Sequence, residues 1–491
     1  MRNKRTWILI ILFFLSTINY FDRVVLSVSI KPISAEFGLS PVQLGYMFSS
    51  FLWLYVIFLV PMGMIVDRFG PRVVNAAGIG VWSLATILTG FAGGFGSLVA
   101  TRIAMGVGES TSYPAGNRVI REWIPASERG LAMSIFNSGA YFGPAVGAVV
   151  IGALVTAFGW RPAFYVCGLI GFVWLAVWLV WYRRPEHAGW LGGAEREFIL
   201  RERNADGAIA GAGPALGVSG LLGKRVMWAI MLTQGCAVYT QYLFLTWLPG
   251  YLQSQKGISI MASASLMALP YLGAVVLGIL AGRVSDRLLS GTTVSGGRRR
   301  LMVGVMLLIG SVILFVPAVN SVAVILVLIT IALTGVSSAI SLNFALLNDL
   351  VHASADIGTA TGIQVVGGNA FGIMAPIVTG YVIAATGNYD LAFVIAGCLL
   401  VIGVVSALVF TRGDLAAKAW SRSITTCFSK LPKICKPRCL RAIRTNCARP
   451  DRITSGCVAS RPVPRPARYS KAHPSIARVT SGASTCRTAA F

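Results

Sequence analysis

Four charged residues stand inside stretches that are otherwise apolar, and they are the side chains most able to do chemistry. Asp22 and Arg23 interrupt one apolar run, and Arg102 and Glu109 interrupt another. A charged side chain in the hydrocarbon of a bilayer costs roughly 2.5–3.5 kcal/mol on insertion scales, and such residues often mark the path of an ion or a substrate. We therefore expect these four residues to have a functional role.

The types and spacing of the four residues suggest two roles. Counted at about 1.5 Å per helical residue, Arg23 and Arg102 fall at similar depths, roughly 7–11 Å from one membrane surface. A guanidinium group suits an anion because its planar fork binds both oxygens of a carboxylate and stays charged at any working pH. Asp22 and Glu109 cannot bind an anion, but a carboxyl group partly withdrawn from water can load and release a proton. The sequence thus predicts an anion site and two proton carriers.

A simpler interpretation is that the charges form two buried salt bridges that only orient helices, although such pairs are a poor source of stability. Adjacent helix positions point about 100° apart, so Asp22 and Arg23 cannot simply neutralise each other. Uncharged polar residues in the apolar runs could line a polar cavity, or could merely form hydrogen bonds between helices. They are Tyr55, Gln234, Tyr239, Gln241, Asn343 and Asn369.

Positioning these residues requires membrane-spanning helices, and the chain has twelve apolar segments of suitable length. A helix crosses the hydrocarbon core with roughly 20 mainly apolar residues. With 55% hydrophobic and 12% charged residues, and a mean hydropathy of +0.73, the chain is not an ordinary soluble protein. We predict an all-α membrane protein whose first segment is a retained helix rather than a signal peptide. The segments are 7–30, 44–62, 73–93, 97–119, 132–155, 161–182, 226–252, 262–282, 301–318, 321–346, 358–385 and 390–411.

The segments divide into two halves of six. The motif Gly63–Arg72 (GMIVDRFGPR) follows the second segment, and Gly282–Arg287 (GRVSDR) follows the eighth. Such repeats bring a substrate site to the interface between the halves, near the middle of the bilayer. We predict an N-terminal half (1–182), a central cytoplasmic loop (183–225), a C-terminal half (226–412) and a disordered basic tail (413–491).

Lysine and arginine collect in alternate loops, which predicts that both termini are cytoplasmic. Charges of the repeated motifs fall at the same side, where a charge network could close a gate. Alternatively, these charges could only set the orientation of the helices in the membrane through the positive-inside rule, but that rule requires neither an aspartate nor the glycine spacing. The candidate gate residues are Asp67, Arg68, Arg72, Asp286 and Arg287.

The chain from about Trp7 to Trp420 resembles the major facilitator superfamily. The signature loop of that superfamily matches Gly63–Arg72, with Pro71 as a departure. Within it, the chain resembles the anion:cation symporter family, through the segments 19–23 (NYFDR), 102–114 (RIAMGVGESTSYP) and 245–249 (LTWLP). That family includes hexuronate, galactonate, glucarate and phthalate permeases and animal sialic-acid and vesicular glutamate carriers. The resemblance implies proton-coupled uptake of a small organic anion across a bacterial inner membrane.

The resemblance also implies residue roles. In bacterial sugar-acid permeases, acids matching Asp22 and Glu109 are implicated in protonation, and residues matching Arg23 and Tyr55 contact the substrate. Residues like Gln241 and Asn369 complete that pocket. Ser110–Ser112 departs from the Glu-Ala-Pro/Ala of many members, which leaves the chemistry of the ligand's substituents open. We expect the substrate to contact Arg23, Arg102, Tyr55, Gln241 and Asn369, with the proton as coupling ion and neither metal nor cofactor.

Other functions fit the sequence less well. An exporter of hydrophobic drugs or metabolites would not need two arginines at one depth, whereas an anion exchanger of the same fold remains an alternative. A sensor would need a folded cytoplasmic domain. An enzyme is not predicted, since His187, His352 and His473 fall in loops or the tail without a nucleophile motif. The expected partners of this monomeric transporter are a small organic anion and the lipid bilayer.

The net charge of +25 does not indicate a nucleic-acid partner, because the tail carries most of it. From Ser421 to Phe491 there are 15 Lys or Arg and one acid, Asp451. This tail could be attracted to anionic lipid at about 1 kcal/mol per charge. A frame-shifted or read-through C-terminus explains its Arg, Pro and Cys content better, and we assign it no function.

Overall fold

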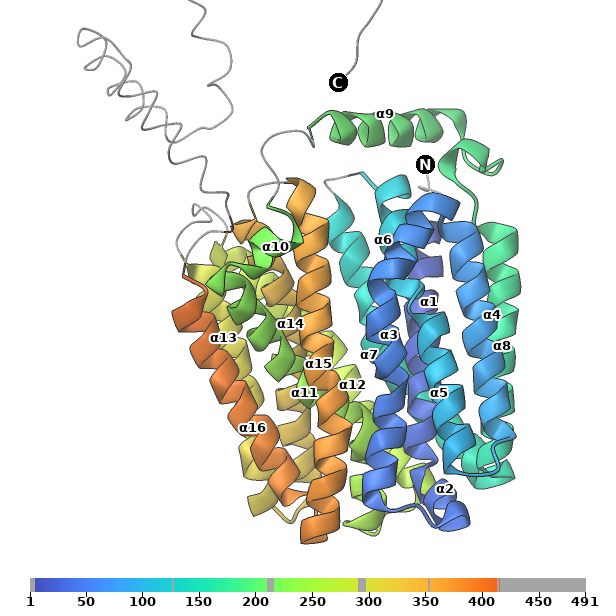
Figure 1. The fold of residues 1–491 in the computed structure, drawn as a ribbon, viewed down its shortest axis with the longest axis vertical. Helices are drawn as coiled ribbons and strands as arrows, with labels where there is room; N and C mark the ends of the chain where they lie inside the picture. The colour runs from blue at the N-terminus through green and yellow to red at the C-terminus, as the bar shows by residue number, and fades with distance from the viewer. Residues whose placement is uncertain are drawn as a thin grey trace, which may run out of the picture. The chain divides into compact units, whose positions relative to one another are not determined.

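The computed structural model describes residues 5–125, 128–209, 216–289, 297–351, 354–412 and 415, all within the compact unit Met1–Lys418. These residues fold almost entirely into helices (Figure 1). The predicted tail (413–491) lies outside the described residues, apart from Leu415. The prediction of an all-α fold is confirmed.

The first half contains six spanning units and a short helix. The span that carries Arg102 and Glu109 is divided in two at Ser110 and Thr111, whose hydroxyls donate to the carbonyls of Val107 and Gly108 at 2.7 and 2.9 Å. The sequence predicted one uninterrupted segment there. The helices are α1 (Thr6–Val28), α2 (Ile30–Phe37), α3 (Pro41–Phe69), α4 (Pro71–Gly90), α5 (Phe95–Glu109), α6 (Ser112–Trp123), α7 (Arg129–Phe158) and α8 (Trp160–Trp181).

The second half repeats this arrangement after a helical connection. The connection consists of a 3₁₀ turn (Pro185–His187), α9 (Gly193–Ile209) and α10 (Gly217–Leu222). The spanning units that follow are α11 (Arg225–Ser254), α12 (Ile260–Leu289), α13 (Arg298–Gly310) with the 3₁₀ segment Ser311–Ala318, α14 (Val322–Leu350), α15 (Ser354–Thr386), and α16 (Asp390–Val405) with the π turn Ser406–Phe410.

Ten helical segments among the described residues are long and apolar enough to cross a membrane. The divided pair α5 and α6 supplies an eleventh crossing, and α11 the twelfth. Helix α11 is less apolar because it carries polar side chains such as Gln234, Thr240 and Gln241. It is nevertheless an interior helix, since every residue from Thr233 to Gln253 except Gln241 is buried. A buried polar helix is where a polar cavity is expected.

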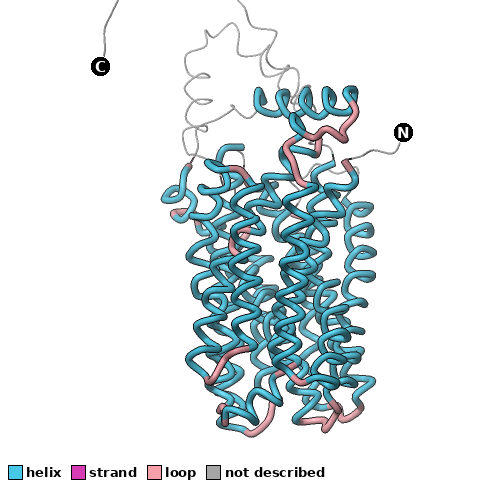
Figure 2. The backbone as a smooth tube through the Cα atoms, turned by 90° about the vertical axis from the view of Figure 1, so that its right-hand side faces the viewer, coloured by secondary structure: helices cyan, strands magenta, loops and turns pink. Residues whose placement is uncertain are grey.

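The two halves meet mainly near one end of the helices. We call the end that carries α2 the α2 face, and the end that carries α9 the α9 face (Figures 1 and 2). Near the α2 face, a Cβ on Gly45 of α3 would lie 2.6 Å from the carbonyl oxygen of Pro376 on α15. Close by, Gln253 of α11 donates to the carbonyl of Val28 on α1 at 3.3 Å. At the α9 face, the contacts found among the described side chains stay within a half.

Candidate functional site

Arg23 lies at the centre of the interface between the halves and is almost fully buried, with 8% of its surface exposed. Its Nε and Nη2 atoms lie 2.9 and 2.8 Å from Oε2 of Glu109. Nη1 donates to the hydroxyl of Tyr242 on α11 at 3.0 Å, and Nη2 donates to Oδ1 of Asn19, one turn earlier on α1, at 3.0 Å. The guanidinium therefore joins both halves and holds an internal carboxylate.

Aromatic rings surround this guanidinium. Its carbon lies 4.4 Å from the ring centres of Tyr20 and Phe51 and 5.2 Å from that of Tyr55. Ring faces stabilise a cation without neutralising it, so they keep Arg23 in place while its donors remain available. Tyr242 completes this group, which we call the Arg23 cage: Tyr20, Phe51, Tyr55 and Tyr242.

Close glycine packing places Glu109 opposite Arg23. A Cβ on Gly106 would collide with the carbonyl of Phe51 on α3, and one on Gly108 would lie 2.7 Å from the backbone nitrogen of Trp82 on α4. Helix α5 thus lies directly against two neighbouring backbones, as small residues allow in membrane helices. Glu109 is the last residue of α5 and is fully buried, and its Oε1 has no hydrogen-bond partner among the described residues.

Glycines on α7 likewise fix α1. Gly139, Gly143 and Gly147 occur at every fourth position and face the backbone or side chains of residues 13–21 of α1. This spacing puts them on one side of α7, so the two helices approach closely. The rotation of α1 that directs Arg23 to the interface is thereby set by its partner helix.

Asp22 and Arg102 occupy a second charged cluster inside the first half. Asp22 is fully buried and close enough to Glu109 and Arg102 to interact with both electrostatically. Neither of its carboxylate oxygens has a hydrogen-bond partner in the part of the chain that the structure describes. Arg102 lies over the ring of Phe164 on α8, and its Nη1 is 3.2 Å from the sulfur of Met105.

The structure therefore brings together only some of the predicted site residues. Tyr55 and Glu109 contact Arg23, whereas Arg102 packs against a different group of residues. Gln241 is 3.5 Å from the hydroxyl of Tyr141 on α7, a marginal contact across the interface. Asn369 donates to the carbonyl of Val365 in its own helix at 2.9 Å and does not contact Arg23 here.

Sequence reasoning missed Asn19, Tyr20 and Tyr242 as partners of Arg23. It also missed Gln364, which donates to Gln234 at 3.1 Å, while Asn343 donates to the same oxygen at 2.9 Å. The available signal was the presence of tyrosine and amide side chains within apolar segments. It could not distinguish these residues from polar residues that bond only to their own helix.

The predicted gate residues form contacts within the first half. Asp67 accepts a bond from Arg118 at 3.1 Å, Arg68 lies over the ring of Phe69, and Arg72 donates to the carbonyl of Leu179 at 2.7 Å. The side chains of the remaining two, Asp286 and Arg287, lie outside the described ones. The gating role of all five residues remains a prediction.

Comparison with known proteins decides the family. The sequence profile described as the Major Facilitator Superfamily matches residues 12–357. The chain belongs to the major facilitator superfamily. Members of this superfamily are membrane transporters, so the chain is a multi-pass transporter and not an enzyme, as its sequence predicted.

Curated members of the superfamily align along most of the chain. A probable galactarate/D-glucarate transporter of Escherichia coli K12 is 32% identical, over 84% of this chain and 94% of its own length. A probable sulfoacetate transporter of Cupriavidus necator is 34% identical over 80% and 90%, respectively. A D-galactonate transporter of Escherichia coli O6:H1 is 30% identical over 84% and 96%.

A solved transporter structure has the same fold. It is a bacterial homologue of the human lysosomal transporter Spinster in an inward-facing and occupied conformation. The TM-score is 0.62 at 19% identity, and the match covers 84% of this chain and 98% of that protein. This similarity supports the arrangement of twelve spanning helices in two halves.

Proposed function

We propose that this chain is a proton-coupled symporter that takes up a small organic acid, of the sugar-acid class or a related carboxylate, by alternating access. The relatives that are named as transporters of galactarate, D-glucarate and D-galactonate support this substrate class. The observation that carries the mechanism is the buried pair of Arg23 and Glu109, in which a carboxylate already occupies the donors suited to a substrate carboxylate.

This internal pair would make substrate binding depend on a proton. While Glu109 is ionised, an incoming carboxylate must compete with it for Nε and Nη2 of Arg23. A proton on Glu109 removes the competing charge and frees the guanidinium for the substrate. When the substrate leaves, Arg23 again favours the ionised form of Glu109, and the proton is released. Proton and anion would therefore travel together.

The neighbouring residues have supporting roles in this proposal. Asp22 would be the second proton carrier, since it interacts electrostatically with Glu109. Arg102, which packs on the ring of Phe164, interacts electrostatically with both acids and would balance their charge when both are ionised. Tyr55, Tyr242 and Gln241 border the interface and offer groups that hydrogen-bond to the hydroxyls of a sugar acid. Asn369 would join them after a change of rotamer.

The predicted topology assigns the two faces of the protein to the two sides of the membrane. If the basic loops are cytoplasmic, the α9 face is cytoplasmic and the α2 face is external. The tight contacts between the halves near the α2 face then correspond to a state sealed toward the outside. Rocking of the halves about the Arg23 cage would expose it to each side in turn.

Uptake into proteoliposomes tests the proposal, with labelled galactarate, glucarate, galactonate and glucuronate and with or without an inward proton gradient. We expect one or more acids to accumulate only with the gradient. Arg23→Ala should abolish uptake, and Arg23→Lys should weaken it because the fork is lost while the charge is kept. Glu109→Gln should still exchange external for internal acid but should not accumulate it.

Two results would contradict the symporter. Accumulation that ignores the proton gradient but requires an internal anion would identify an anion exchanger. Failure of every acid to enter, together with outward movement of hydrophobic compounds, would identify an exporter.

A further inference from the structure

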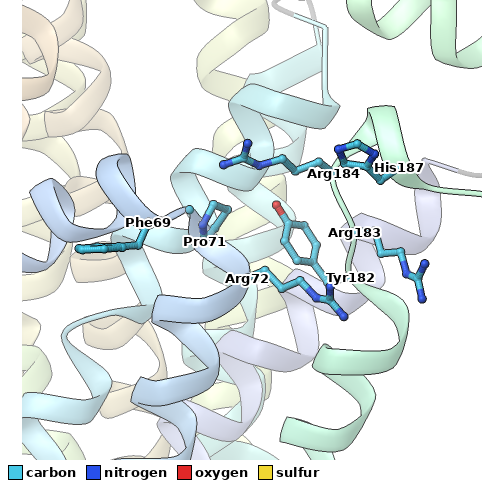
Figure 3. A pocket seen from close by; sticks show the side chains of 8 residues that line it. Phe69, Pro71, Arg72, Tyr182, Arg183, Arg184 and His187 are labelled. Atoms are coloured by element: carbon cyan, nitrogen blue, oxygen red, sulfur yellow. The ribbon is translucent and has the colours of Figure 1, made fainter.

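A cavity of about 360 Å³ lies at the α9 face, apart from the Arg23 cage, between the loop that joins α3 to α4 and the end of α8 (Figure 3). Its lining includes Arg72, Arg183 and Arg184, and none of the lining residues is acidic. The volume falls in the range of small-ligand sites, about 300–1,000 Å³. We call it the basic pocket.

The arginines of the basic pocket retain free donors. Arg72 uses one nitrogen to hold the carbonyl of Leu179 at 2.7 Å, and the indole of Trp178 donates back to the carbonyl of Arg72 at 3.0 Å. Arg183 and Arg184 are exposed, and neither is in an ion pair with a described residue. In Figure 3, Arg184 and Arg72 lie on either side of the Tyr182 ring. The pocket therefore concentrates positive charge, and no acidic side chain is among the described residues that line it.

The start of α4 adds to this positive potential. Its N-cap is Gly70, which has no side chain to cap the helix, and its first turn contains no acid. Uncapped N–H groups and the helix dipole both favour an anion at such an end. Gly70 has a φ of 85°, and a Cβ there would lie 2.8 Å from Nη2 of Arg184. Glycine thus lets this arginine lie directly over the helix terminus.

One side of the pocket is apolar and exposed. Phe69 lines it and is 59% exposed, and Val73, Val180 and Trp181 nearby are each more than half exposed. In a membrane protein such side chains face lipid. Trp181 also pairs with Trp7, with ring centres 6.1 Å apart, and tryptophans of this kind mark the headgroup level of a bilayer. The pocket thus presents cations beside a lipid-facing apolar wall.

We propose that the basic pocket binds the phosphate group of an anionic membrane phospholipid. Arg72 and Arg184 contact the phosphate beside the start of α4, Arg183 adds charge, and the acyl chains lie along Phe69 and Val73. A bound lipid would tie the loop between α3 and α4 to the end of α8. This site is independent of Arg23 and of the identity of the transported acid.

Native mass spectrometry of the full-length purified protein tests the site by counting bound phosphatidylglycerol, with phosphatidylcholine and inorganic phosphate as comparison ligands. Each arginine that contacts the bound headgroup is expected to contribute about fivefold in affinity, so Arg184→Gln should weaken phosphatidylglycerol binding about fivefold and the pair Arg72→Gln with Arg184→Gln about 30-fold. The control pair Arg225→Gln with Arg298→Gln removes two exposed arginines that begin α11 and α13 and should change it less than twofold.

Several outcomes would overturn the proposal. Equal retention of phosphatidylcholine would exclude selection for a net negative headgroup. Inorganic phosphate that displaces the lipid completely at equal concentration would identify a soluble phosphate as the ligand. Equal losses of phosphatidylglycerol affinity in the pocket and control variants would show that the overall charge of the protein, and not the basic pocket, determines lipid binding. Because the side chain of Arg184 makes no hydrogen bond to a described residue, its single variant keeps the test valid even if loss of Arg72 disturbs folding.

Discussion

At the scale of residues, Arg23 differs from an ordinary buried cation in the variety of its partners. One carboxylate, one amide, one hydroxyl and three ring faces surround it. Only the carboxylate neutralises its charge, so only that partner needs to be replaced when an anion binds. The remaining partners can hold the guanidinium in position throughout a transport cycle.

The hydroxyl of Tyr242 is the contact of Arg23 that crosses to the second half, and its removal should weaken substrate binding. Loss of one hydrogen bond to a charged group costs about 1.5–3 kcal/mol, so we expect Tyr242→Phe to raise the KM for the acid by roughly tenfold or more. Initial rates of uptake over a range of acid concentrations measure this.

Tyr251→Phe is the matched control for Tyr242→Phe. Tyr251 lies on the same helix, but its ring packs against Tyr389 and Phe393 near the α2 face. The KM of the Tyr251→Phe variant for the acid should stay within about twofold of the wild-type value, since no hydrogen bond to a charged group is lost. Equal effects of the two variants would contradict a direct role for the Tyr242 hydroxyl.

At the scale of elements, glycine contacts determine where the charges point. Gly106 and Gly108 seat α5 against α3 and α4, and the glycines of α7 seat α1. Because Glu109 directly follows Gly108 and ends its helix, a small displacement of α5 would separate it from Arg23. The charge site therefore depends on residues that carry no functional group.

We predict that Gly108→Ala impairs both stability and uptake. Its Cβ would lie 2.7 Å from the backbone nitrogen of Trp82 and 2.8 Å from the carbonyl oxygen of Gly78, and neither atom can move alone. Overpacking of this kind costs about 1–3 kcal/mol, which should appear as a lower melting temperature in detergent together with slower uptake. Gly96→Ala in the same helix, with open space around its Cβ, is the control and should leave both unchanged.

Helix α2 is fastened to α8 by a charge pair that should respond to pH. Glu36 accepts bonds from Arg161 at 2.6 and 2.8 Å and from the indole of Trp160 at 2.7 Å. The Arg161 guanidinium, followed by the indole, lowers the pKa of Glu36 below its ordinary value. The pair therefore stabilises the fold above the unfolded-state pKa of about 4.3, and this stabilisation is lost as the pH falls through the folded-state value.

Thermal unfolding of Glu36→Gln should reveal that dependence. At pH 7 the variant should melt at a slightly lower temperature than the wild type, because a screened surface pair contributes little. The difference should shrink as the pH falls below about 4, where the wild-type carboxylate also becomes protonated. Lys31→Gln on the same helix should show no such trend. A difference that is constant with pH would point to packing rather than charge.

At the scale of the whole transporter unit, the contacts between the halves gather near the α2 face. Gly45 and Gly380 bring α3 and α15 together, and the hydroxyls of Tyr46 and Tyr381 lie 3.4 Å apart beside them. In a second pair of helices across the same interface, Gly152 of α7 faces Ala264 of α12. Separation of these contacts is the step that alternating access requires.

Gly45→Val should shift the conformational equilibrium toward a state that is open at the α2 face. Its side chain would meet the backbone of Pro376 and Ile377, which can be relieved only if α3 and α15 move apart. We expect faster hydrogen–deuterium exchange at the start of α3 and the end of α15, and slower uptake. Gly96→Val on α5 has no atom within 4 Å of its Cβ and serves as the control. Unchanged exchange in Gly45→Val would show that these contacts do not hold the seal.

The sequence by itself determined the number of spanning segments and the residues worth testing. A bilayer requires long apolar helices and makes intramembrane charges costly, so both features can be recognised in the amino-acid sequence. Asp22, Arg23, Arg102 and Glu109 were all identified in this way. The break after Glu109 was not, because helix-compatible residues such as Ser110 and Thr111 terminate a helix only when their hydroxyls and the packing around them favour it.

Only the tertiary structure decided which charges meet. Arg23 and Glu109 are 86 residues apart and Arg23 and Tyr242 are 219 apart, so no local pattern couples them. Equal depth suggested that Arg23 and Arg102 would act together, but depth fixes only the position along a helix axis. The rotation about that axis depends on close contacts through Gly106, Gly108 and the glycines of α7, and it directs Arg23 to the interface and Arg102 into the first half.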